Sequence, residues 1–186
     1  MERFRVLPGL PATGPWPEQF SASGRGMHQE GFVVEFSPEG KPTWVGNFQP
    51  GITDYNIVLP HSDGTSLIVV AGGQAYLINP EERRSLAIFG GSIDTALAVP
   101  SAGLLVMGNG IWLEAWDSSG LRWRSRRFAW DGMRDLRIEN GKVKGEAWSA
   151  VDDREYPFAV DLTTGTVEGG SYDGPPDAFG DNTNQH

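Results

Sequence analysis

Short apolar runs recur along the chain, and most of them alternate with polar residues and end at a Gly, Pro, Asn or Asp. This pattern is typical of β-strands separated by tight turns. It predicts strands at residues 3–8, 19–23, 32–36, 43–48, 55–60, 66–71, 75–79, 85–89, 94–99, 104–107, 111–116, 121–128, 134–139, 142–148, 156–161 and 166–172. We expect all of them to form antiparallel meanders. No segment combines a helical period with capping residues, so the sequence favours an all-β fold.

A turn that begins with a side-chain acceptor recurs at regular spacing. Ser37, Asn79, Asp117 and Asp161 each end a predicted strand, and they stand 42, 38 and 44 residues apart. Side chains of these types accept hydrogen bonds from backbone N–H groups two or three residues further on. The spacing divides the chain into four units of about forty residues, each with four strands.

A second landmark lies where each unit begins. Asp54, Asp94 and Asp135 each stand three residues after a Gly and lead into a short apolar strand, and Glu2 occupies the corresponding place at the start of the chain. Such an Asp can simply bond backbone N–H groups at the turn between units. The alternative is a ring of carboxylates near a common axis, which could hold a cation.

Two of the repeated segments resemble known repeat proteins. VDLTTGTV at 160–167 and YLINPEE at 76–82 are similar to blades of PQQ-type and WD40-type β-propellers, in which the third strand ends in Asp or Asn. The resemblance covers residues 2–174 and implies a small β-propeller-like array of four four-stranded antiparallel units. It implies binding on the faces of the disc but no particular reaction. A β-sandwich, or a half-propeller that dimerises, fits the same turn spacing.

Length and composition fit this picture. We expect a single β-repeat domain over residues 1–174 and a flexible polar C-terminal tail over 175–186, which is rich in Pro, Gly, Asn and Asp. The chain has no Cys, which excludes disulfides and thiolate metal sites. No apolar segment follows residues 1–5 and no apolar run reaches about 18 residues, so we expect no secretory leader and a cytoplasmic protein that does not bind membranes.

The charge narrows the class of partner. Asp and Glu number 24 against 15 Lys and Arg, which gives a net charge of −9. Repulsion from phosphates argues against nucleic-acid binding and favours a protein partner with a basic surface. The oligomeric state is left open.

Candidate chemistry is sparse. The three His residues, His28, His61 and His186, do not have the spacing of a zinc-binding helix, and no Gly-x-Ser-x-Gly elbow marks a nucleophile. We therefore expect no cofactor. The acidic segment 152–155 could be a cation site or a contact loop, but it lacks the Asp-x-Asp-x-Asp-Gly pattern of a calcium loop, which favours a solvated hairpin loop.

The stretch 112–127 predicts a hairpin with aromatic, acidic and basic side chains on one exposed face. Cross-strand pairs of this kind stabilise a sheet, and this structural interpretation is favoured over an anion-binding stripe. The predicted pairs are Trp112–Arg126, Glu114–Arg124 and Trp116–Arg122.

Loops on a rigid β-scaffold are where binding usually resides. In a propeller, the loops that enter each unit share one face with the loops between second and third strands. We predict a non-enzymatic binding module that uses this acidic loop face to bind a protein, for example an immunity or inhibitor protein against a cationic partner. The alternatives are a carboxylate-dependent hydrolase or lyase on one propeller face and a glycan-binding module that uses surface Trp. The predicted partner-binding residues are His28, Glu30, Asp54, Asp94, Asp135, Asp152, Asp153 and Glu155.

Overall fold

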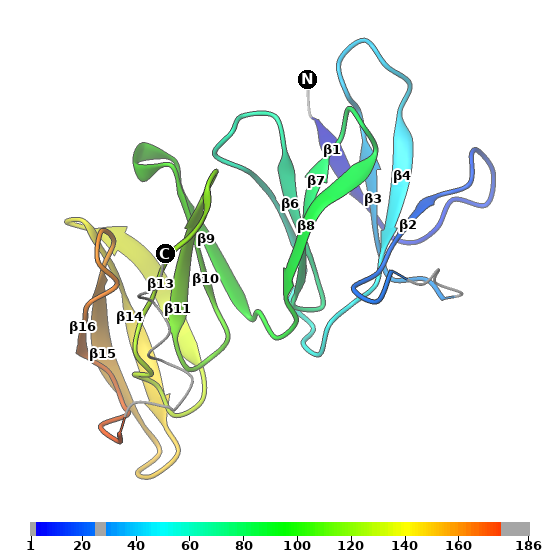
Figure 1. Ribbon diagram of the computed structural model, residues 1–186. Helices are drawn as coiled ribbons and strands as arrows, with labels where there is room; N and C mark the ends of the chain where they lie inside the picture. The colour runs from blue at the N-terminus through cyan, green and yellow to red at the C-terminus, as the bar shows by residue number, and fades with distance from the viewer. Residues whose placement is uncertain (1–2, 25–28, 176–186) are drawn as a thin grey trace. The chain divides into compact units, whose positions relative to one another are not determined.

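The computed structural model describes residues 3–24 and 29–175, which form four sheets of four strands each (Figure 1). The chain divides into two units by its internal contacts, which we call the N-terminal unit (Met1–Ile93) and the C-terminal unit (Asp94–His186). Each unit holds two of the sheets. The predicted all-β array of four four-stranded units is therefore confirmed. A single domain over residues 1–174 stays a prediction, and so does closure into a ring.

The N-terminal unit holds the first eight strands. They are β1 (Phe4–Leu7), β2 (Glu18–Phe20), β3 (Phe32–Phe36), β4 (Trp44–Phe48), β5 (Ile57–Pro60), β6 (Leu67–Ala71), β7 (Gln74–Asn79) and β8 (Arg84–Gly90).

The C-terminal unit holds the other eight and one turn of 3-10 helix, η1 (Pro100–Ala102). The strands are β9 (Thr95–Val99), β10 (Leu104–Gly108), β11 (Leu113–Asp117), β12 (Gly120–Arg124), β13 (Met133–Glu139), β14 (Lys142–Ser149), β15 (Arg154–Asp161) and β16 (Val167–Gly169). Among the described residues, no helix is long and apolar enough to cross a membrane.

Three sheets are the predicted antiparallel meanders, but the first is not. Its order is β1-β3-β4-β2, and β2 pairs in parallel with β4. The buried amide of Asn47 explains this placement, because it donates to Gln19 Oε1 (2.9 Å) and to the Gln29 carbonyl (3.1 Å) and accepts from Gly31 N (2.8 Å). It thereby ties the returning chain to the outer side of β4. The strand predicted at 19–23 is present as β2, but its predicted place in an antiparallel meander is wrong, because it pairs with β4 at the edge of the sheet.

β12 and β16 are among the strands that end earlier than predicted. β12 ends at Arg124 because Ser125 turns back onto β11, where its N–H donates to Leu113 O (2.8 Å) and its Oγ accepts from Leu113 N (3.0 Å). β16 ends at Gly169 because Gly169 and Gly170 have φ of 72° and 97°, which a strand does not accommodate.

Each unit has its own buried core, and within each unit a Trp bonds a backbone carbonyl of the neighbouring sheet. In the N-terminal unit, Trp44 of β4 stacks on Phe36 (4.3 Å between ring centroids) and donates its indole N–H to Pro80 O (2.9 Å). In the C-terminal unit, Trp123 of β12 donates to Leu162 O (2.8 Å). Both carbonyls directly follow the Asn or Asp that ends a third strand. A Trp on β4 or on β12 therefore ties consecutive sheets together in both units.

Candidate functional site

Two of the predicted binding residues lie in the described part of the N-terminal unit, Glu30 and Asp54; His28 and Glu2 lie outside the described residues. Glu30 Oε2 accepts from Leu10 N (2.8 Å), so this carboxylate holds the loop between β1 and β2. Asp54 is exposed just before β5, and its backbone carbonyl accepts from the side chain of Asn56 (3.0 Å). The two residues share no hydrogen-bond partner among the described residues.

Asp94 directly precedes β9, and its carboxylate lies against the turn between β10 and β11. A Cβ on Gly110 would come within 3.0 Å of Asp94 Oδ2, so the glycine makes room for this carboxylate. Burial of the carboxylate raises the pKa of Asp94 above its ordinary value, hydrogen bonds from the backbone of Asp94 and Gly110 oppose the shift, and the charge of Asp131 adds to it. Asp94 therefore contacts a turn within its own sheet.

Asp135 is not equivalent to Asp54 and Asp94, contrary to the sequence analysis. It lies in an irregularity within β13, where the pairing with β14 shifts between Arg134 and Arg137, and its φ is 55°. Arg134 Nε lies 3.8 Å from Asp135 Oδ2 and 3.2 Å from Glu155 Oε1. Arg134 therefore brings two of the predicted acidic residues together.

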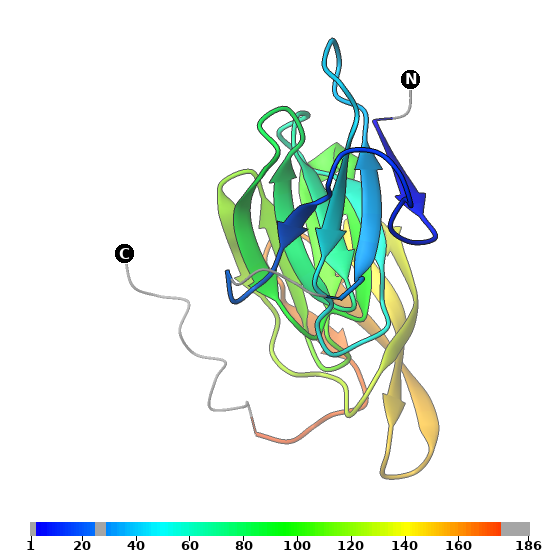
Figure 2. The ribbon, with the colours of Figure 1, turned by 90° about the vertical axis from the view of Figure 1, so that its right-hand side faces the viewer.

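The hairpin between β14 and β15 projects beyond the rest of its sheet (Figure 2). Its tip is closed by Ser149, whose carbonyl accepts from Asp153 N (3.0 Å) and whose Oγ accepts from Val151 N (3.3 Å). Trp148 donates its indole N–H to Asp153 Oδ1 (3.2 Å). The Tyr156 hydroxyl donates to Asp152 Oδ2. The loop is therefore fixed by its own side chains.

Val151 stands at this tip with 75% of its surface exposed, between fixed carboxylates. Hydrogen bonds from Ser149 and Tyr156 lower the pKa of Asp152, which keeps that carboxylate charged at neutral pH. The hydrogen bond to Asp152 raises the pKa of Tyr156. We call the tip 148–156 together with Arg134 and Asp135 the acidic hairpin. It presents one exposed apolar side chain, Val151, between charged side chains.

The base of the acidic hairpin rests on a cluster of Arg and aromatic side chains. Ser171 Oγ donates to Trp148 O (2.7 Å) and accepts from Trp130 N (3.1 Å). The Trp130 ring meets the Tyr172 ring edge-on at 5.0 Å, and the Arg127 guanidinium lies 4.2 Å from the Tyr172 centroid. These contacts anchor the hairpin to the segment that follows β16.

In the hairpin of β11 and β12, one of the three predicted cross-strand pairs is confirmed. Glu114 lies opposite Arg124, and their closest contact is 2.6 Å. Trp116 faces Leu121 instead of Arg122, because the pairing shifts by one residue at Ala115 and Trp116.

The third predicted pair, Trp112–Arg126, is also wrong. It is Arg124 that lies over the Trp112 ring (5.3 Å), while Arg126 donates to the carbonyls of Gly169 (3.3 Å) and Tyr172 (3.4 Å). The face is less exposed than predicted, since only 18% of the Glu114 side chain is accessible.

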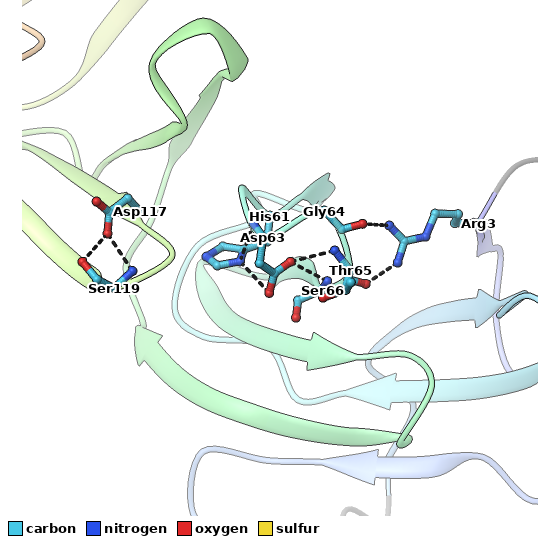
Figure 3. Close-up of polar contacts among 8 residues, drawn as sticks. All are labelled: Arg3, His61, Asp63, Gly64, Thr65, Ser66, Asp117 and Ser119. Atoms are coloured by element: carbon cyan, nitrogen blue, oxygen red, sulfur yellow. Dashed lines mark hydrogen bonds and ion pairs between the residues drawn. The ribbon is translucent and has the colours of Figure 1, made fainter.

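A Ser, a His and an Asp meet in the turn before β6, but not in a catalytic order (Figure 3). Asp63 Oδ1 accepts from Thr65 N (2.8 Å) and Ser66 N (2.7 Å), and His61 Nδ1 lies 3.1 Å from Asp63 Oδ2. Burial alone would raise the pKa of Asp63, but the hydrogen bonds from Ser66, Thr65 and His61 outweigh it and hold the pKa below its ordinary range. A nucleophile needs the imidazole beside the hydroxyl, whereas here the carboxylate is the common acceptor. The group closes a turn, as Asp117 does with Ser119 N (2.7 Å) and Oγ (2.6 Å).

Two exposed features of the N-terminal unit were not found from the sequence. A groove of about 1050 Å³ is lined by Arg3, residues 37–43, Gly64, Thr65 and Glu81. Trp16 lies between two prolines with 95% of its surface exposed. The Pro-Trp-Pro sequence is a signal for the second feature, because flanking prolines stiffen an extended loop. Among the described residues, no group of three or more His, Asp or Glu is placed to hold a metal ion.

The comparisons with known proteins found similarity to solved structures only. No known sequence family and no curated protein matches the chain. A crystal structure of a eukaryotic initiation factor is similar over 75% of this chain and 39% of that one, with 9% identity and a TM-score of 0.45. Myxococcus xanthus glutaminyl cyclase is similar over 89% and 75%, with 16% identity and a TM-score of 0.36. Kluyveromyces lactis Hsv2 is similar over 59% and 43%, with 10% identity and a TM-score of 0.32. The chain spans less than half the length of the initiation factor chain.

Proposed function

We propose that this protein is a non-enzymatic binding protein that uses the acidic hairpin to bind a protein with a basic surface. The observation that carries the proposal is Val151, which is 75% exposed at the tip of a loop whose carboxylates are all held in place. An immunity or inhibitor protein against a cationic partner is one concrete form of this function.

The geometry of the hairpin supports binding for two reasons. The loop is already ordered by Ser149, Trp148 and Tyr156, so little conformational entropy is lost when a partner docks. Its carboxylates surround the apolar tip, and charges at the rim of an interface act mainly on the rate of association and on salt dependence.

The same contacts favour binding over a hydrolase or lyase. Asp152 and Asp153 accept from Tyr156 and Trp148 on the two sides of the tip, and Glu155 pairs with Arg134. Two carboxylates that hydrolyse a glycosidic bond must instead face each other across the substrate.

The experiment starts by identifying the partner. A photo-crosslinking residue in place of Val151 captures the bound protein in cells, and that protein is then purified. Its association rate is measured with the wild type and with a variant that combines Asp152→Asn, Asp153→Asn and Glu155→Gln. We expect the variant to associate about tenfold more slowly at low salt, with the difference shrinking at high salt because ions screen rim charges.

A control variant combines Glu39→Gln, Glu82→Gln and Glu168→Gln, which removes the same net charge elsewhere. We expect this control to keep most of the association rate. Equal rates for the hairpin variant and the wild type at both salt concentrations would rule out the acidic hairpin as the binding site.

Trp16 favours a second candidate function, glycan binding. Its indole is exposed beside a cavity of about 330 Å³ whose lining includes Gln19, Gln29 and Glu30. Aromatic rings stack on sugar rings, and amide and carboxylate groups bond sugar hydroxyls. A glycan array probed with the wild type and with Trp16→Ala tests this. A glycan bound by the wild type and lost in the variant would support it, and an array without a bound glycan would contradict it.

A further inference from the structure

β8 is the outer strand of the second sheet, and its outer edge is long and apolar. It runs for seven residues and, among the described residues, pairs with β7 alone. Leu86 and Ile88 are exposed by 40% and 41%. The pairing with β7 shifts at Leu86 but is regular from Ala87 to Gly90. Such an edge offers unpaired N–H and C=O groups at every second residue.

The outer strands of the other three sheets are protected against pairing with another chain. β2 and β16 have three residues each, and β2 directly follows Pro17. β12 carries the side chains of Arg122 and Arg124, and Arg122 stands at an irregularity in its pairing with β11. Short strands, charges, prolines and bulges are the devices by which proteins keep sheet edges from associating. Beyond the irregularity at Leu86 and the charge of Arg84 at its first residue, β8 has none of them.

We propose that β8 pairs antiparallel with β8 of a second copy of this chain, which joins two four-stranded sheets across a two-fold axis. A strand that pairs with itself in this way forms an isologous contact, in which each copy uses the same residues. If the axis passes through Ile88, Ala87 of one copy lies opposite Phe89 of the other, and the two exposed Ile88 side chains meet on one face. Burying these side chains removes apolar surface from water.

Charge is the reason to choose a second copy over the basic partner of the acidic hairpin. Residues 85–93 contain no charged side chain, and Arg84 at the start of β8 is paired with Glu82. The edge therefore offers nothing that attracts a cationic protein. For two chains of net charge −9, an uncharged contact avoids close repulsion between like charges. A single strand edge is a small interface, so we expect a weak dimer that forms as the protein concentration rises.

The test is sedimentation velocity of the full chain over a wide range of protein concentration at low and at high salt. We expect a monomer–dimer equilibrium that shifts toward the dimer at high salt, because salt screens the repulsion between acidic chains. Binding through the acidic hairpin has the opposite salt dependence, so failure of one proposal is distinguishable from failure of the other.

Two substitutions locate the contact. Ile88→Lys places two like charges at the two-fold axis and should leave a monomer at all concentrations, whereas Leu121→Lys on β12 should dimerise as the wild type does. Leu121 is 39% exposed on an outer strand, which makes it a matched control, and near-ultraviolet circular dichroism confirms that both variants are folded. A wild type that stays monomeric at the highest concentration, or a dimer unaffected by Ile88→Lys, would overturn the proposal.

Discussion

Single side chains hold several of the turns in the described part of the chain. Asn79 Oδ1 accepts from Glu81 N (3.0 Å), and Asp161 Oδ1 accepts from Thr163 N and Thr164 N (both 2.9 Å). Asp117 bonds Ser119 in the same way. The repeated turn acceptor was predictable from the sequence at these three positions, because the contact is local and depends on residue type alone. Ser37 differs from these three residues, because it is its backbone N–H that forms a hydrogen bond, donated to Arg3 O (2.9 Å).

The first prediction concerns the pH dependence of the Asp161 turn. The hydrogen bonds from Thr164 and Thr163 lower the pKa of Asp161 in the folded state. A lowered folded pKa gives stability that is fully present above the unfolded pKa of about 3.9 and is lost as pH falls through the folded pKa. Asp161→Ala should therefore lower the melting temperature at pH 7, and the difference from the wild type should narrow as pH falls below about 4.

Asp161→Asn separates the charge from the hydrogen bond. Asn keeps an acceptor oxygen but carries no charge, so we expect a smaller loss of melting temperature at pH 7 than for Asp161→Ala. This difference should also narrow as pH falls, because the carboxylate of the wild type becomes protonated. Asp54→Ala serves as the control, because Asp54 is exposed and its side chain closes no turn. The explanation would be wrong if Asp161→Ala had the same effect on the melting temperature at pH 3 as at pH 7.

Two Arg–Glu pairs between neighbouring strands differ in burial, and we expect them to differ in their contribution to stability. Glu35 of β3 lies opposite Arg5 of β1, and Glu114 of β11 lies opposite Arg124 of β12. Arg5 is exposed by 66% in its side chain, and the contact is a single 3.0 Å approach. Glu114 accepts from Arg124 Nε (2.7 Å) and, through its other oxygen, from the indole of Trp116 (3.0 Å).

We therefore expect Glu114→Gln and Glu35→Gln to differ in cost. Removing an ionised acceptor that holds two partners in a half-buried site should lower the free energy of unfolding by about 1–2 kcal/mol. The exposed pair should contribute roughly 0–1 kcal/mol. Urea denaturation of the two variants measures both values. Equal costs would show that burial does not decide the strength of these pairs.

The order of strands in the first sheet shows where sequence patterns stop being informative. Apolar alternation predicted that strands exist near residues 3–8 and 32–36, and both are present. It did not predict that β1 pairs directly with β3. That pairing depends on the hydrogen bond from the buried amide of Asn47 to Gln19, which holds β2 beside β4. The irregularity at Asp135 was missed for a similar reason. A positive φ at an Asp follows from the pairing of β13 with β14 and leaves no periodic signal.

For the molecule as a whole, the four-unit repeat was predictable from the sequence. Which of the predicted binding residues lie close together was predictable only in part. Four units of four strands follow from turn spacing, a property that is preserved along the chain. Of the predicted binding residues, Asp152, Asp153 and Glu155 share one hairpin and Asp135 joins them through Arg134, whereas Asp94 supports a separate turn. Val151 was not selected, because one apolar residue in an acidic loop is not a signal until its exposure is known.

The last prediction is that each unit folds by itself. One buried cluster draws its residues from positions 20–78 and the other from 99–162, so each core is complete within its unit. The boundary falls between Ile93, which bonds Gly73 O, and Asp94, which bonds Gly108 O. Chains 1–93 and 94–186, expressed separately, should each show β-sheet circular dichroism and a cooperative thermal transition, since about 90 residues with one core is enough for a domain. A cut after residue 60 separates β5 from β6 and should leave residues 1–60 unfolded. If 1–93 or 94–186 is also unfolded, the two cores stabilise each other, and the chain is one cooperative domain.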